Sequence, residues 1–151
     1  MSIQAGFTLV PTSVFKEPYD KAIDALKDIT TRVRDVPKIQ MDLGYMLERE
    51  GRYEEAAQAF EAASRLAPLD PNPYVMVAHM KMQTNDPEAA VGGYRKALDL
   101  QPGADAVRVG LTRALMTVGN WAEAAVEVDR WRARRRARRR IVPSSSGCCC
   151  R

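Results

Sequence analysis

The chain has 151 residues, of which 46% are hydrophobic, a composition that excludes wholesale disorder and fits one domain or two small ones. Its net charge is +4 and its sequence pI is about 9.1, but the charge is unevenly divided. Residues 1–130 hold 15 basic and 19 acidic residues, whereas residues 131–151 hold eight arginines and no acidic residue. The high pI therefore reflects a short basic tail on an acidic body and does not itself indicate a nucleic-acid-binding fold.

No apolar run approaches the roughly 18–20 residues that cross a bilayer. The segment from Met1 to Phe15 carries no lysine or arginine and includes Pro11, so we expect no secretory signal. The adjacent Cys148, Cys149 and Cys150 lack the spacing of a metal-binding pair or a disulfide framework. These features favour a cytoplasmic protein without a membrane span or a bound metal.

The first predicted element in chain order is a helix that begins near residue 18. We expect residues 1–17 to be irregular, because Pro11 would interrupt a helix there. Tyr19 and Leu26 then recur at helical spacing, and both align with apolar positions of the repeats that follow. We interpret residues 18–36 as a capping helix or a degenerate half-repeat.

From residue 37 onward the sequence repeats with a constant step of 34 residues. Residues one step apart are of similar type. The step links three sets of apolar or small residues and one set of turn residues. These sets are Leu43-Gly44, Val77-Ala78 and Leu111-Thr112; Ala56, Ala90 and Ala124; Phe60, Tyr94 and Val128; and the turn residues Gly51, Asn85 and Gly119. Three copies in phase predict three repeats, over residues 37–70, 71–104 and 105–134.

Each repeat is predicted to form a hairpin of two helices. In the first, Pro37 has a φ angle suited to a helix start, and Gly51 suits the left-handed turn after the helix. A second helix over about 54–66 ends before Pro68. The same pattern predicts helices near 73–84, 87–99, 105–118 and 121–134, the last of which could continue to about residue 140 because Ala and Arg favour helices.

This pattern resembles the tetratricopeptide repeat (TPR) family, in which W-x₂-L-G-x₂-Y, A-x₃-F and P recur with a period of about 34 residues. The first copy carries Leu43-Gly44, Ala56-x₃-Phe60 and Pro68. The third departs from the pattern, with Trp131 and Arg136 where the family has Ala and Pro. The resemblance implies an all-α fold: an α-α superhelix, or TPR solenoid, of three helical hairpins with an N-terminal capping helix.

No residue set in the chain has the pattern of a catalytic site. His79 is the single histidine, and Glu54-Glu55 stands at a helix start, where carboxylates stabilise the helix dipole. We therefore expect no enzyme activity and no cofactor.

In the TPR family, the first helix of each hairpin lines a concave groove that binds a peptide or helix of a partner protein. The resemblance therefore implies a non-catalytic protein–protein interaction module, such as a scaffold, adaptor or co-chaperone. The implied groove residues are Lys38, Met41, Tyr45, Arg49, Asn72, Val75, His79, Met82, Val109, Arg113 and Met116. Because five of them are Met or Val, we expect apolar anchors; the alternative is that the methionines only pack between hairpins.

The basic tail, residues 135–151, is open to several interpretations. It could be a solvated end, an arm that binds polyanions such as nucleic acid, or the product of a frameshift in a larger TPR-containing protein such as a glycosyltransferase. Palmitoylation of Cys148–Cys150 is a further alternative. The candidate polyanion residues are Arg134, Arg135, Arg136, Arg138, Arg139 and Arg140. Self-association through exposed helix ends is also compatible with the sequence.

Overall fold

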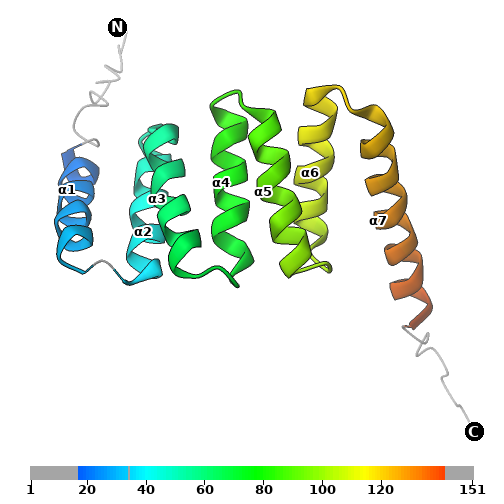
Figure 1. Cartoon of the computed structure of the whole chain (residues 1–151), viewed down its shortest axis with the longest axis horizontal. Helices are drawn as coiled ribbons and strands as arrows, with labels where there is room; N and C mark the ends of the chain where they lie inside the picture. Colours follow the sequence, from blue (N-terminus) through cyan, green and yellow to red (C-terminus); the bar gives the residue numbers. More distant parts are fainter. Residues whose placement is uncertain (1–16, 34, 142–151) are drawn as a thin grey trace, which may run out of the picture. The chain divides into compact units, whose positions relative to one another are not determined.

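The computed structural model of the chain describes residues 17–33 and 35–141, which form seven α-helices and, within these ranges, no strand (Figure 1). The predictions for residues 1–16 and for Cys148–Cys150 lie outside the described residues. No described helix has the length and apolar character needed to cross a membrane. The chain divides into two compact units, Met1–Pro68 and Leu69–Arg151.

The first unit contains α1 (Glu17–Arg32), α2 (Pro37–Arg49) and α3 (Tyr53–Leu66). Helices α2 and α3 form a hairpin, and α1 packs against α2. Pro37 occupies the first turn of α2, as the sequence predicts. This unit therefore consists of one helical hairpin with an additional helix beside it.

The hairpin of the first unit depends on a close approach between Gly44 of α2 and the Phe60 ring of α3. A Cβ atom at Gly44 would lie 2.5 Å from Phe60 Cε1, and Phe60 is fully buried. Ala56 and Ala63, which flank Phe60 on the same helix, are also fully buried. Small residues around one large ring thus let the two helices pack closely.

Glu55 joins α1 to the start of α3 through charge. Its carboxylate accepts hydrogen bonds from Arg52 Nε at 2.7 Å and from Lys27 Nζ of α1 at 3.2 Å. The hydrogen bond from Arg52 lowers the pKa of Glu55, with a further lowering by Lys27, against a partial burial that raises it. The ionised carboxylate is therefore the form that holds α1 on α3.

The second unit contains α4 (Pro71–Gln83), α5 (Pro87–Leu100), α6 (Asp105–Val118) and α7 (Trp121–Ile141). Helices α4 and α5 form one hairpin and α6 and α7 a second, while α6 packs on α5 and also contacts α4. The carboxylates of Asp70 and Asp86 cap α4 and α5 by accepting hydrogen bonds from the backbone N–H groups of Asn72 and Ala89. Two consecutive hairpins therefore share one hydrophobic core.

That core contains Tyr94 and Ala97 of α5, with Leu111 and Leu115 of α6. The Tyr94 ring packs under α6, where a Cβ atom at Gly110 would lie 2.8 Å from Tyr94 Cε1. Burial of this ring raises the pKa of the Tyr94 hydroxyl. As at the first hairpin, a glycine provides the space for a buried aromatic ring.

The turn residues that the repeat step links all have left-handed backbones. The φ angles are +74° at Gly51, +61° at Asn85 and +90° at Gly119. Glycine and asparagine tolerate this region better than other residues, so the periodic choice of residue type has a direct backbone cause.

Helix α7 differs from the other helices in length. It has 21 residues and continues to Ile141, so residue 134, the predicted end of the third repeat, lies inside a helix. The expectation that the last helix could run to about residue 140 is confirmed. The division into three repeats and a tail stays a prediction.

Candidate functional site

In the second unit, the predicted groove residues lie on α4 and α6, two helices in contact with each other. Four come from α4 and three from α6: Asn72, Val75, His79 and Met82, and Val109, Arg113 and Met116. On α6, Val109 is 49% exposed and Met116 is 46% exposed, and Arg113 is exposed between them. This exposed apolar pair beside an arginine is a feature typical of binding surfaces.

The α4 residues are less available than those of α6. Val75 and Met82 are partly buried and pack against the core of the unit. His79 is half-buried and Asn72 is exposed. Packing between helices therefore accounts for part of the apolar set on α4, whereas the α6 side chains remain open to a partner.

The four predicted residues of the first unit all lie on α2. Lys38, Tyr45 and Arg49 are exposed, and Met41 is half-buried. Tyr45 packs edge-on against the buried Phe60, with ring centroids 5.3 Å apart and an interplanar angle of 71°. Tyr45 is thus fixed by the core while 39% of its surface stays exposed.

A pocket between α6 and α7 was not predicted from the sequence. It has a volume of about 360 Å³ and an almost entirely apolar lining. Its lining combines predicted groove residues of α6 with Thr112, Val128 and Trp131. In the sequence, Trp131 stands out only as a departure from the repeat pattern, and that departure was the available signal.

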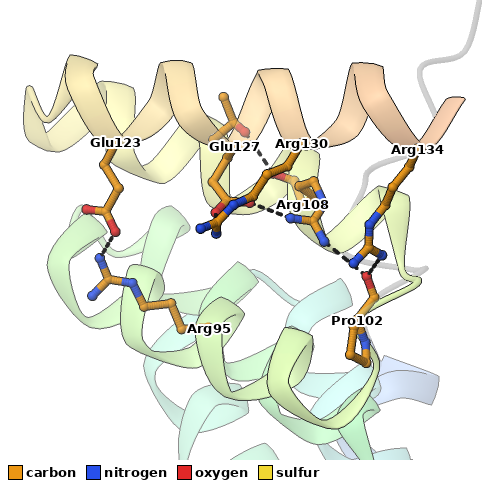
Figure 2. Close-up of polar contacts among 8 residues, drawn as sticks. Arg95, Pro102, Arg108, Glu123, Glu127, Arg130 and Arg134 are labelled. Atoms are coloured by element: carbon orange, nitrogen blue, oxygen red, sulfur yellow. Dashed lines mark hydrogen bonds and ion pairs between the residues drawn. The ribbon is translucent and has the colours of Figure 1, made fainter. Parts of the chain in front are cut away.

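A buried ion pair beside this pocket fastens α7 to α6 (Figure 2). Arg108 Nη1 donates to Glu127 Oε2 at 2.5 Å, and both side chains are more than nine-tenths buried. Glu127 also accepts from Arg130 at 2.6 Å, and Arg108 Nη2 donates to the Pro102 carbonyl oxygen at 3.0 Å. The repeat register contained a signal for the burial of Glu127, which stands two repeats after the buried Ala59, but none for its partner.

The candidate polyanion residues divide between two faces of α7. Arg134 donates to the Pro102 carbonyl oxygen between α5 and α6, and Arg138 pairs with Asp105, the first residue of α6, at 3.3 Å (Figure 2 shows Arg134). On another face, Arg135 lies over the Trp131 ring at 4.7 Å. Arg136 and Arg139 are exposed, and the Arg140 side chain lies outside the described residues. The structure therefore does not bring all of these residues into one patch, although Arg135, Arg136 and Arg139 line a common pocket on α7.

Among residues 17–33 and 35–141, no three His, Cys, Asp or Glu side chains are grouped in a way that could hold a metal ion. The features that distinguish this chain are instead the hairpins and the exposed face of α6. They define an α-helical repeat protein, in which stacked hairpins present surfaces to other proteins.

Two tetratricopeptide repeat family models match the chain, over residues 16–71 and 81–141, and together they cover most of it. The chain therefore belongs to the tetratricopeptide repeat family, and the expected fold class, an all-α TPR solenoid, is confirmed. Membership of this family makes it a protein-interaction module in the broad sense.

Known proteins of similar sequence or structure agree with this assignment. The chain is 29% identical over 89 residues to the peroxisomal targeting signal receptor of Saccharomyces cerevisiae, a match that covers 59% of this chain and 14% of that protein. A crystal structure of MamA protein superposes with a TM-score of 0.77 at 16% identity, covering 83% of this chain and 69% of MamA. A MamA structure from Desulfovibrio magneticus RS-1 gives a TM-score of 0.70 at 18% identity, with coverages of 80% and 68%. At these identities the structural likeness shows the fold alone.

Proposed function

We propose that this chain is a non-catalytic interaction module that binds a peptide or helix of a partner protein. Binding uses the exposed face of the first helix of each hairpin, that is, of α2, α4 or α6. The observation that carries the proposal is the face of α6, where Val109 and Met116 are about half exposed on either side of Arg113. The apolar side chains can bury apolar surface of a ligand, and the arginine beside them can donate a charged hydrogen bond to the same ligand.

The matched relative supports a peptide as the ligand, because its name describes a receptor for a targeting signal. A role as scaffold, adaptor or co-chaperone in the cytoplasm is part of the same proposal. Tyr45 and Arg49 of α2 offer the first unit a comparable combination of aromatic and basic groups.

The test is selection of binders from a random library of 15-residue peptides, followed by fluorescence anisotropy with the full chain. We expect the double variant Tyr45→Ala/Arg113→Ala to lower the affinity for a selected peptide by more than tenfold. The matched control Gln58→Ala/Glu88→Ala changes two exposed residues of the second helices α3 and α5 and should leave the affinity within twofold.

The selected peptide should also shift backbone amide resonances in NMR spectra, those of α2 in the first unit or those of α4 and α6 in the second. Shifts confined to α3, α5 and α7, or equal effects of the two double variants, would overturn the proposal. Circular dichroism of each variant establishes that the helices remain folded.

A further inference from the structure

The pocket between α6 and α7 is lined by residues whose counterparts are packed away in the preceding hairpin. One repeat step relates four pocket residues to four residues of α4 and α5. The pairs are Val109 and Val75, Met116 and Met82, Val128 and Tyr94, and Trp131 and Ala97. Tyr94 and Ala97 are buried in the core of the second unit, and Val75 and Met82 pack against it.

The structure shows what covers that surface in the preceding hairpin, because α6 packs on α5 with Gly110 over the Tyr94 ring. The cover is thus a helix with a small residue at the contact. One step later, the corresponding helix would begin near residue 139, but α7 runs without a break to Ile141. In the part of the chain that the structure describes, the α6–α7 surface has no such cover, and Val109 and Met116 remain about half exposed.

Positive charge borders the apolar pocket. Arg113 lines it from α6, and Trp131 is shared with a second pocket of about 300 Å³ on α7. The rest of that second lining is entirely arginine: Arg132, Arg135, Arg136 and Arg139. All four side chains are exposed. These linings therefore favour a ligand that combines an apolar face with negatively charged groups such as carboxylates.

We infer that the α6–α7 surface binds an acidic amphipathic helix supplied by a partner protein. The apolar side chains of that helix cover Met116, Val128 and Trp131, and its carboxylates pair with Arg135 and Arg139. This is recognition of a helix in a groove, with apolar anchors at helical spacing and charges at the rim. The site shares the α6 residues with the proposed peptide-binding face, but its α7 residues belong to it alone, so the two proposals can fail separately.

The experiment uses the full chain and three synthetic 18-residue helical peptides labelled with fluorescein. The first has leucines on one face and glutamates beside them, the second has lysines in place of the glutamates, and the third is a scrambled form of the first. We expect anisotropy to detect binding of the first peptide, at least tenfold weaker binding of the scrambled peptide, and no binding of the lysine peptide. Equal binding of the acidic and lysine peptides would overturn the inference.

Two tryptophans of the same helix supply a matched pair of variants. Trp131→Ala should lower the affinity for the acidic peptide at least tenfold. Trp121→Ala removes a 63% exposed ring outside both pockets and should change this affinity by less than twofold. Equal effects of the two substitutions would contradict the site. If Trp131→Ala disturbs the fold, Arg135→Glu/Arg139→Glu replaces it, since both side chains are exposed. That variant should no longer bind the acidic peptide and should bind the lysine peptide instead.

Two alternative occupants are distinguished by the same variants. Sedimentation that shows a dimer abolished by Trp131→Ala would identify a second copy of this chain as the occupant and overturn the inference. Binding of a 20-nucleotide single strand that competes with the acidic peptide and is unaffected by Trp131→Ala would identify a polyanion site and overturn it as well. Peptide binding that persists in the presence of the strand supports the acidic helix.

Discussion

Replacement of Glu127 by alanine should remove much of the stability of the second unit. The substitution leaves the Arg108 guanidinium, whose side chain is only 7% exposed, without its carboxylate partner. Breaking a buried pair by removing one partner costs about 3–5 kcal/mol, because the remaining charge is buried without compensation. The Arg130 contact adds little, since that side chain is 64% exposed and a surface pair contributes about 0–1 kcal/mol. A loss of about 3–5 kcal/mol is large against the roughly 5–15 kcal/mol that stabilises a typical domain.

Urea unfolding followed by tryptophan fluorescence reports on this helix directly, because both tryptophans of the chain, Trp121 and Trp131, lie in α7. The control is Asp129→Ala on the same helix, which breaks an exposed 3.5 Å pair with Arg132 and should cost less than about 0.5 kcal/mol. A loss for Glu127→Ala that is no larger than this control would refute the argument from burial.

A third variant separates charge burial from packing. In Arg108→Met/Glu127→Leu, apolar side chains of similar volume replace both charges, so no buried charge is left without a partner. We expect the double variant to recover most of the lost stability, as similar replacements of buried ion pairs do. A double variant as unstable as Glu127→Ala would instead indicate that the pair itself provides net stabilisation.

Three further predictions concern single positions. Gly119→Ala should cost about 1–2 kcal/mol in thermal melts, because φ is +90° there, and Gly119→Asn should cost less; equal losses would contradict the backbone argument. Gly44→Ala should cost about 1–2 kcal/mol by forcing a Cβ atom against the Phe60 ring, whereas Gly92→Ala, in open space on α5, should gain about 0.5–1 kcal/mol from helix propensity. Glu55→Gln should lower the melting temperature at neutral pH. Because the pKa of Glu55 is lowered on folding, its contribution is present above the unfolded-state pKa and disappears as pH falls through the folded-state pKa, so the two melting curves should converge in acid. A constant difference down to pH 2 would exclude this linkage.

The helices were predictable because their limits depend on local backbone chemistry that recurs at each step of the repeat. Pro37 at the start of α2 and the positive φ angles at Gly51, Asn85 and Gly119 are direct consequences of residue type. The buried positions Ala56 of α3 and Ala90 of α5 follow from the same periodicity, since they are equivalent positions one repeat apart. In these elements local preference and tertiary packing require the same residues.

The contacts around α7 could not be predicted in the same way. Arg108 and Glu127 are 19 residues apart, and nothing in the helical period indicates that their side chains meet. The exposure of Val109 and Met116 is equally non-local, because it depends on whether another helix covers α6. The candidate groove residues lie on α2, α4 and α6, but the sequence alone did not distinguish those that pack against the core from those that remain exposed.

The third hairpin differs from the second at the positions that face its pocket. Where α5 has a ring at Tyr94 and a methyl group at Ala97, α7 has Val128 and Trp131, so the aromatic residue has moved three positions along the helix. Residues three apart lie on the same helix face, and the face therefore remains apolar while its shape changes. Beyond Trp131 the helix contains only Arg and Ala before Ile141, and its described contacts with the chain between α5 and α6 are made by Arg134 and Arg138. Charged contacts therefore hold this end of α7, next to the α6–α7 surface for which we infer a binding role.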